Sequence, residues 1–434
     1  MQQKISLKLL PSEASSEASI TGAIAKVAGK KQGSVTGFRV LKKSIDARSR
    51  TIWINLTVNA FIDEPFHERA KQVFHFDNVS NALKKVVIIG AGPAGLFAAL
   101  QLVQLGIKPI ILDRGKDVRA RRRDLAILNK EGTINPDSNY CFGEGGAGTY
   151  SDGKLYTRSN KRGDIDRILT LFVQFGADEK ILYEAHPHIG TNKLPHIITA
   201  MRALLIGSGA EFLFEKKVTG LVIKAGEVTA VTTRDGDSYR GDAVILATGH
   251  SARDIFELLH DKKILTEAKP FALGVRVEHP QALIDNVQYH LPARNEFLPP
   301  ASYSLVQQVQ GRGVFSFCMC PGGIIAPAAT SASELVVNGW SPSKRNNPFA
   351  NSGMVVQVEI ADVAREGKKH KILSRDDGSL ELMRFQQMVE QRCFSAGGGA
   401  FRAPAQRMVD FSYDRLSASL LLPVLIPQGY LQFN

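Results

Sequence analysis

Residues 86–95 read Val-Val-Ile-Ile-Gly-Ala-Gly-Pro-Ala-Gly, and they determine the fold class expected for this 434-residue chain. An apolar strand leads into three glycines with the spacing GxGxxG, at Gly90, Gly92 and Gly95. The first glycine allows a sharp turn, the second leaves room for a pyrophosphate, and the third lets a helix pack on the sheet. We therefore expect a strand, a glycine turn and a helix from 93 to 105, whose N-terminal end favours phosphate groups.

A second apolar strand, residues 110–112, ends in the carboxylate of Asp113. This carboxylate lies 23 positions after Gly90, where it can accept hydrogen bonds from ribose hydroxyls. A GxGxxG motif alone is weak evidence, because glycine turns are common. With the strand, the helix and the acid all in place, the segment predicts a dinucleotide-binding βαβ unit.

The composition is typical of a soluble globular enzyme with two or three domains, since 44% of the residues are hydrophobic and 22% are charged. We expect neither a secretory signal nor a transmembrane helix, because no long apolar run is present. Four cysteines do not suggest a disulfide framework, and they favour a reducing cytoplasm. The net charge of +12 favours a solvated surface over an anionic partner.

The segment 1–80 predicts a small α+β domain, with strands near 4–10, 37–41 and 51–58 and a helix over 15–27. A basic turn between the last two strands suggests a hairpin. RNA binding through this hairpin is an alternative to a docking or lid role. The segment lacks the aromatic pattern of RNA-binding modules, so the docking role is preferred.

Downstream patterns predict helices near 165–175 and 194–208 and a strand-rich stretch from 211 to 246. The last strand ends in Ala247, Thr248 and Gly249. Small residues at the carboxyl end of a buried strand let a nucleotide approach the backbone closely. This arrangement is similar to the inner motif of flavoproteins with two dinucleotide-binding domains.

The loop 142–154, Phe-Gly-Glu-Gly-Gly-Ala-Gly-Thr-Tyr-Ser-Asp-Gly-Lys, suits close approach to an anion or a flat ring. Within it, Tyr150, Ser151 and Lys154 are candidates to face a flavin ring, and the lysine would stabilise negative charge on the reduced ring. Arg114 and the cluster 119–123 are candidates to pair with phosphates. A solvated helix start explains that cluster equally well.

Other polar residues give weaker signals. His186, His188 and His196 lack the partners of a metal site, so no metal is expected. Cys318 and Cys320 are interpreted as two small buried residues rather than a redox dithiol, whereas Cys141 is the more exposed candidate for reactivity. Three titratable residues of the later chain are expected to form ordinary ion pairs: His250, Arg253 and Glu278.

Five motifs carry a family resemblance: residues 90–95, 142–155, 247–254, 274–280 and 317–323. With these motifs the chain resembles the bacterial FAD-dependent dehydrogenases of unassigned substrate, within the glutathione-reductase-like flavoproteins. The resemblance covers residues 1 to about 410. It implies FAD as the cofactor and an N-terminal α+β domain, and it implies no substrate.

Relatives of this kind continue beyond the 396–400 region with a strand, a glycine turn bearing an acid and a helix beneath the flavin's ribityl chain. Here the chain runs through Val409 and Asp410 to Asn434 without that turn. The expectation from this departure is a truncated C-terminus that binds FAD weakly or not at all.

We therefore expect an α/β protein with a Rossmann-like FAD-binding domain, an inserted mixed or antiparallel β substrate domain and a small N-terminal α+β domain. The expected domains are 1–80, 81–264 (FAD-binding), 265–400 (β-rich substrate or cap domain) and an atypical tail, 401–434. The candidate cofactor-binding residues are Gly90, Gly92, Pro93, Ala94, Gly95, Asp113, Arg114, Arg122, Gly145, Gly146, Gly148, Thr149, Ser151, Lys154, Val218, Ala247, Thr248 and Gly249.

The expected function is an FAD-dependent oxidoreductase that transfers hydride through the flavin to or from an unknown small molecule. NAD(P)H is a candidate transient reductant, since a single GxGxxG leaves no dedicated domain for it. The alternatives are a catalytically impaired flavoprotein remnant and an RNA-binding or RNA-modifying protein that uses a nucleotide cofactor. No catalytic residues are predicted, and neither a membrane nor a nucleic acid is the expected partner.

Overall fold

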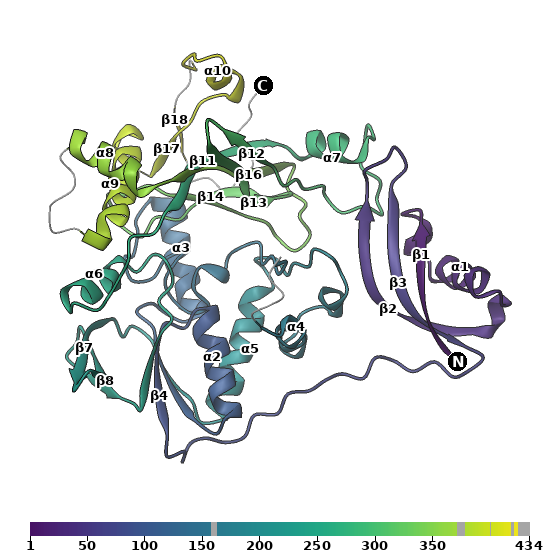
Figure 1. Ribbon diagram of the computed structural model, residues 1–434, viewed down its shortest axis with the longest axis horizontal. Helices are drawn as coiled ribbons and strands as arrows, with labels where there is room; N and C mark the ends of the chain where they lie inside the picture. Colours follow the sequence, from purple (N-terminus) through teal and green to yellow (C-terminus); the bar gives the residue numbers. More distant parts are fainter. Residues whose placement is uncertain (158–162, 371–377, 400, 418–420, 424–434) are drawn as a thin grey trace.

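The computed structural model describes residues 1–157, 163–370, 378–399, 401–417 and 421–423. The chain begins with a small unit of three strands and one helix, which Figure 1 shows set apart from a larger body. The body contains a parallel sheet with its helices and a set of antiparallel strands. The expected α/β class, with a Rossmann-like parallel sheet and additional antiparallel β structure, is confirmed.

The N-terminal unit is an antiparallel sheet with strand order β1-β3-β2, covered on one face by α1. Its elements are β1 (Gln2–Leu9), α1 (Glu17–Ala28), β2 (Val35–Asp46) and β3 (Trp53–Ile62). Alternate residues of β1 and β3 are buried, as expected for a sheet with one face against a helix. Ser16 caps α1 by accepting a hydrogen bond from the Ser19 amide, and the predicted helix is confirmed. The antiparallel pairing of β2 with β3 confirms the predicted hairpin.

The core of this unit extends to the body. Tyr289 at the end of α7 (Gln281–Tyr289), together with Leu298 and Ala301, is buried in the same apolar cluster. A backbone contact between Lys43 and Glu184 adds a second connection. Residues 63–84, which contain neither helix nor strand, lead from β3 to the parallel sheet (Figure 1).

The parallel sheet has the strand order β10-β4-β5-β6. The strands are β4 (Lys85–Ile89), β5 (Lys108–Leu112), β6 (Glu211–Leu213) and β10 (Ala243–Leu246). Because both faces of a parallel sheet are covered, its strands are continuous apolar runs. One face packs against helices α2 (Pro93–Gln104), α4 (Ile165–Gln174) and α5 (Leu194–Gly207). The other face packs against the antiparallel strands β7 (Val218–Lys224), β8 (Glu227–Thr233) and β9 (Ser238–Arg240).

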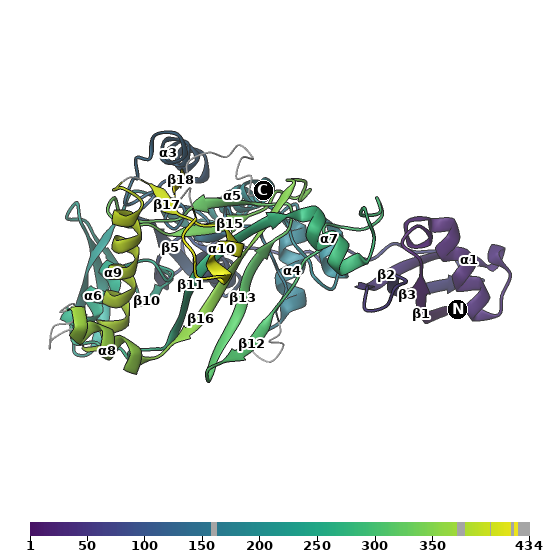
Figure 2. The same cartoon turned by 90° about the horizontal axis from the view of Figure 1, so that it is seen from above.

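The second large sheet is antiparallel, with the order β11-β16-β13-β12, and its strands fan out in the view of Figure 2. These strands are β11 (Phe271–Pro280), β12 (Val306–Val309), β13 (Arg312–Cys320) and β16 (Phe349–Val358). A hairpin of β14 (Ile324–Pro327) and β15 (Val337–Trp340) lies beside it. In the chain these strands all follow β10.

Helices fill the remaining body: α3 (Val118–Glu131), α6 (Arg253–Asp261), α8 (Ile360–His370) and α9 (Glu381–Ala396). The last described elements are β17 (Arg402–Pro404), α10 (Met408–Ser412) and β18 (Leu421–Pro423). The sequence patterns did not predict α6, α7, α8, α9 or α10. The predicted domain boundaries stay predictions, and part of the predicted tail lies outside the described residues. Within the described chain, no helix is long and apolar enough to cross a membrane.

Candidate functional site

The glycine turn after β4 leaves no room for a side chain at its first and third glycines. A Cβ on Gly90 would lie 2.4 Å from the carbonyl oxygen of Ala247 on the neighbouring strand, and the φ of Gly90 is +109°. A Cβ on Gly95 would lie 2.0 Å from the Gly90 carbonyl oxygen. Both positions therefore require glycine, because β4, α2 and β10 approach one another by their backbones.

The N-terminus of α2 provides hydrogen-bond donors without a side chain that satisfies them. Gly92 is the N-cap, and it makes no side-chain capping bond. Pro93 occupies the first turn, followed by Ala94 and Gly95, whose N–H groups have no partner inside the helix. A Cβ on Gly92 would lie 3.8 Å from Cα of Gly146, an ordinary van der Waals contact, so a methyl group would fit here without a clash. This arrangement fits a phosphate group.

Asp113 is buried and fixes the same turn. Its carboxylate accepts hydrogen bonds of 2.8 Å from the amides of Ala91 and Gly115. The carboxylate thus joins the end of β5 to the glycine turn, a role that sequence reasoning missed. Its role toward a ribose stays a prediction.

The glycine-rich loop lies directly over the turn. The Gly145 amide donates a 2.8 Å hydrogen bond to the Ala91 carbonyl. A Cβ on Gly146 would lie 3.2 Å from Cα of Gly92, and a Cβ on Gly148 would lie 3.2 Å from Pro93. Two segments about fifty residues apart in the chain therefore meet at the N-terminus of α2.

Arg121 holds this loop in place, and sequence reasoning missed it. The residue is fully buried, and its guanidinium donates to the carbonyl oxygens of Asn139, Tyr140, Gly143, Glu144 and Gly146 and to Oγ1 of Thr149. The sequence contained a signal, since Val118, Arg121, Leu125 and Leu128 follow helical spacing and form the buried face of α3.

The other arginines near the turn lie in different surroundings. Arg122 is exposed, so the cluster turns Arg121 inward and Arg122 toward solvent. Arg114 pairs with Asp254 and lies over the ring of Phe142, with 4.4 Å between the guanidinium carbon and the ring centroid. The structure therefore holds Arg114 in an internal ion pair and exposes Arg122, and the pairing of these arginines with phosphates stays a prediction.

The later loop residues are mostly engaged internally. Oγ1 of Thr149 donates to the Glu144 carbonyl at 2.8 Å, and Oγ of Ser151 donates to the Gly148 carbonyl at 2.8 Å. The hydroxyl of Tyr150 donates to the Val118 carbonyl. These bonds stabilise the loop, and the predicted approach of Ser151 and Tyr150 to a flavin ring stays untested.

Lys154 points to the antiparallel sheet. Its ammonium donates to the Met319 carbonyl oxygen and lies 3.4 Å from the Asp152 carboxylate. It also lies 3.8 Å from Sγ of Cys320. Lys154 therefore connects the glycine-rich segment with the end of β13.

The remaining candidates lie around β10 and β7. The Ala247 amide donates a hydrogen bond to the carbonyl of Ile89, the last residue of β4. The pairing of β10 with β4 therefore extends one residue beyond β10. Cα of Thr248 is 3.3 Å from the position of a Cβ on Gly90, and Gly249 has φ of +73° with open space around it. Val218 is buried in the cluster between the parallel sheet and β7.

Two expectations about cysteines are corrected. Cys141 is partly buried with its thiol 3.6 Å from the Ala328 carbonyl oxygen, and burial raises its pKa, so the expectation of an exposed reactive thiol is wrong. Cys320 is buried as expected, but Cys318 is exposed. Cys318 has φ of +47° and lies at a register shift between β13 and β16. Such an irregularity interrupts the alternation of a regular strand, so Cys318 and Cys320 differ in exposure.

The ion-pair expectation is confirmed for Arg253, which pairs with Glu334 and Glu390 at 2.6 Å each. It is wrong for Glu278, whose Oε2 is buried without a hydrogen-bond partner among the described residues. Burial raises the pKa of Glu278 to about 7. Burial also lowers the pKa of His188 to about 4, and its ring contacts the Ser343 carbonyl.

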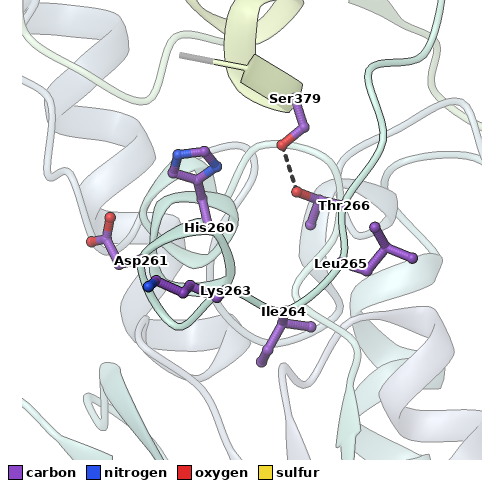
Figure 3. Close-up of a pocket in the computed structure, with 7 residues that line it drawn as sticks. All are labelled: His260, Asp261, Lys263, Ile264, Leu265, Thr266 and Ser379. Carbon is purple, nitrogen blue, oxygen red and sulfur yellow. Dashed lines mark hydrogen bonds between the residues drawn. The ribbon is translucent and has the colours of Figure 1, made fainter. Parts of the chain in front are cut away.

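Among the pockets that the described residues form, one lies at the end of α6 and another lies beside Asp113. The larger, about 480 Å³, is an open hollow at the end of α6, where Thr266 and Ser379 share a hydrogen bond (Figure 3). None of its lining residues belongs to the glycine motifs. The smaller pocket has a volume of about 140 Å³, and its lining begins with Arg114, the residue after Asp113. It is lined by polar and charged residues: Arg114, Lys116, Asn135, Asp137, Ser138, Glu215 and Arg234.

Three family models match successive parts of the chain. Residues 84–267 match the pyridine nucleotide-disulphide oxidoreductases, and 270–430 match the "FAD-dependent protein, C-terminal domain-like" family. Residues 1–61 match a domain family of unknown function. An uncharacterized protein of Clostridium beijerinckii is 36% identical over 397 residues, which cover 88% of this chain and 72% of that protein. The chain belongs to the bacterial FAD-dependent oxidoreductases.

Solved structures also resemble this FAD-dependent oxidoreductase, at low scores. The tetracycline destructase Tet(51) has a TM-score of 0.31 and 13% identity, over 73% of this chain and 68% of that chain. The amino acid oxidase NikD has a TM-score of 0.32 and 16% identity, over 64% and 72%. The GidA-related protein from Thermus thermophilus has a TM-score of 0.25 and 17% identity, over 46% and 74%. These scores carry no information about its substrate.

Proposed function

We propose that this FAD-dependent oxidoreductase is a dehydrogenase that exchanges a hydride between a small molecule and FAD. The supporting observation is the turn at Gly90, Gly92 and Gly95, where uncapped amides of α2 meet a second glycine-rich loop. NADH or NADPH would bind transiently as the reductant. When bound, FAD supplies two-electron redox chemistry that no side chain provides.

In this proposal the backbone amides of Gly92, Ala94 and Gly95 bind the FAD pyrophosphate. Residues 145–149 cover it from the other side, because Gly146 and Gly148 approach the N-terminus of α2 without side chains. The positive end of the helix dipole adds an attraction for the two phosphate charges.

The adenosine end would lie beyond Asp113, beside the smaller pocket. Asp113 is already held by two backbone amides, so its carboxylate can accept a ribose hydroxyl only through the remaining lone pairs of its oxygens. The small residues Ala247 to Gly249 leave the end of β10 open to the same region.

A purified sample tests the proposal directly. We expect stoichiometric FAD in the absorbance spectrum and bleaching of its bands on anaerobic addition of NADH or NADPH. A colourless protein that FAD does not reconstitute would overturn the proposal. The same spectrum tests the expectation of weak FAD binding from the sequence.

A matched pair of variants separates binding from folding. A methyl group in Gly92→Ala fits the structure, but it occupies the space beside the free amides. Loss of one charge-assisted hydrogen bond would weaken FAD binding by about tenfold to a hundredfold. Gly33→Ala, whose Cβ meets nothing within 4 Å, is the control and should bind FAD normally. Equal FAD affinity of the two variants would contradict the proposed site.

A further inference from the structure

We propose that Arg276 and Lys154 form a binding site for the carboxylate group of a small organic acid, at the junction of the glycine-rich segment and the antiparallel sheet. The proposal rests on the proposed function, because the organic acid would be the substrate of the flavin reaction. It assigns a chemical class to a substrate that the family resemblance leaves open.

Arg276 is held firmly, and only by neutral groups. From β11 its Nε donates to Oδ1 of Asn351 at 2.7 Å, and its Nη2 donates to the Cys318 carbonyl at 2.9 Å. A longer contact of 3.5 Å joins Nη1 to Oδ1 of Asn338. Among the residues that the structure describes, no carboxylate lies within ion-pair distance of Arg276. Its charge is therefore not compensated by an ion pair with any of these residues.

A second cation converges on the same place. Nζ of Lys154 lies 3.8 Å from Sγ of Cys320, and Nη2 of Arg276 lies 3.7 Å from that sulfur. Contacts from a cationic N–H to sulfur are weak compared with bonds to an anionic oxygen. A carboxylate that replaced them would bond to both cations at once. Solvent reaches the site, since Lys154 and Cys318 are exposed.

The local charge balance favours an anion. Asp152 pairs with Lys154 at 3.4 Å and with Arg345 at 2.7 Å, so two cations share one carboxylate. Arg276 adds a third positive charge beside them. A single bound carboxylate would reduce the excess to one charge, and the opposite charges would attract strongly in a partly dehydrated site.

The side chain of Asn351 is an independent observation that points to a ligand here. The residue is fully buried, and its Oδ1 is used by Arg276, but its Nδ2 has no hydrogen-bond partner among the described residues. A buried amide without a partner costs free energy, so native proteins rarely leave one. An anionic oxygen beside Arg276 would provide that partner.

The backbone also makes room for the guanidinium. A Cβ on Gly339 would lie 2.4 Å from Nη2 of Arg276, so the arginine packs against a glycine of β15. A purely structural role for Arg276, which would hold the irregular end of β13 through Cys318, is the competing explanation. The two explanations differ in their response to added anions.

The test uses the full chain as purified, with acetate, benzoate and succinate as probes and benzamide as the neutral match of benzoate. Thermal midpoints and titration calorimetry are recorded at constant ionic strength. We expect at least one carboxylate to bind and to raise the midpoint, and benzamide to do neither. Failure of all three carboxylates, or equal binding of benzamide, would overturn the site.

Variants locate the effect. Arg276→Gln and Lys154→Gln should each weaken carboxylate binding by about tenfold to a hundredfold, and Arg276→Lys should restore part of it. Arg312→Gln is the control, because it removes a cation of β13 that is paired with Asp362. If Arg276→Gln does not fold, Lys154→Gln decides the question. Unchanged binding in a folded variant excludes the proposal.

Flavin absorbance of the same samples separates this proposal from the proposed function. If the protein contains stoichiometric flavin but binds no carboxylate, only the proposed anion site is refuted. If the protein binds a carboxylate but takes up no flavin, the proposed function is refuted and the proposed anion site stands.

Discussion

Nη2 of Arg121 donates a 2.7 Å hydrogen bond to the carbonyl oxygen of Gly146. This bond joins the inner face of α3 to the loop that lies over the N-terminus of α2. A fully buried arginine with six acceptors on a single loop is a structural support for that loop. The position of the proposed pyrophosphate site therefore depends on a residue that would not touch the cofactor.

Replacing Arg121 should disorganise the loop. Arg121→Met keeps much of the apolar stem but leaves several buried carbonyl oxygens without donors. We expect the free energy of unfolding to fall by about 3–5 kcal/mol and the bound FAD to be lost. Urea unfolding and flavin absorbance measure the two effects.

Arg122→Met is the matched control, since its side chain is exposed on the same helix. It should change the free energy of unfolding by no more than about 0.5 kcal/mol. Similar behaviour of the two variants would show that the hydrogen bonds of Arg121 do not support the loop.

The glycine turn gives a second prediction. Gly90→Ala places a methyl group 2.4 Å from the Ala247 carbonyl oxygen and strains a φ of +109°. The parallel strands β4 and β10 would have to separate, so we expect little folded, flavin-bearing protein. Gly106→Ala also has a positive φ, +71°, but open space around it, and it should cost only about 1 kcal/mol. Soluble yield and flavin content distinguish the two, and equal yields would contradict the steric argument.

Asp113 gives a third prediction. In Asp113→Asn one carboxylate oxygen becomes an NH₂ group. This group cannot accept a hydrogen bond, so the bond from either the Ala91 or the Gly115 amide is lost. We expect a loss of about 1–3 kcal/mol in the free energy of unfolding, and weaker FAD binding because the turn loosens. Denaturant unfolding of the FAD-free protein isolates the structural part. No change there would limit Asp113 to a contact with the ribose.

The raised pKa of Glu278 leads to a fourth prediction, that stability depends on pH. Burial raises the pKa of its carboxyl in the folded protein to about 7, from an ordinary 4.5. The folded state therefore binds the proton more tightly than the unfolded chain does. This contribution to stability is complete below pH 4.5 and is lost as the pH rises through 7.

Glu278→Gln imitates the protonated acid without titrating. At pH 8 it should raise the free energy of unfolding by about 1–3 kcal/mol, with partial exposure of the group reducing the gain, and at pH 4 it should have little effect. Glu296→Gln, at an exposed position, should change stability at neither pH. A gain for Glu278→Gln at pH 4 as large as that at pH 8 would refute the assignment.

The amino-acid sequence by itself determined the elements around the glycine turn. Apolar runs, glycine spacing and the acid at 113 act through neighbouring residues, so β4, α2 and β5 were predictable within a residue or two. The hairpin of the N-terminal unit and the strands from 211 to 246 were predictable for the same reason. Helices α7 to α9 were not predicted. In the fold α7 packs against β11 and β16, and α8 packs against α9, so their stability depends on partners that the local pattern does not specify.

Only the tertiary structure decided how side chains far apart in the chain are used. It turned Arg121 inward and Arg122 outward, and it placed Lys154 against the end of β13. Among the described residues, it also left Arg276 without a carboxylate within ion-pair distance and Oε2 of Glu278 buried without a hydrogen-bond partner. Burial and the identity of a charged group's partner depend on which segments pack together. No local pattern contains that information, so the charge balance of the site appears only in the folded chain.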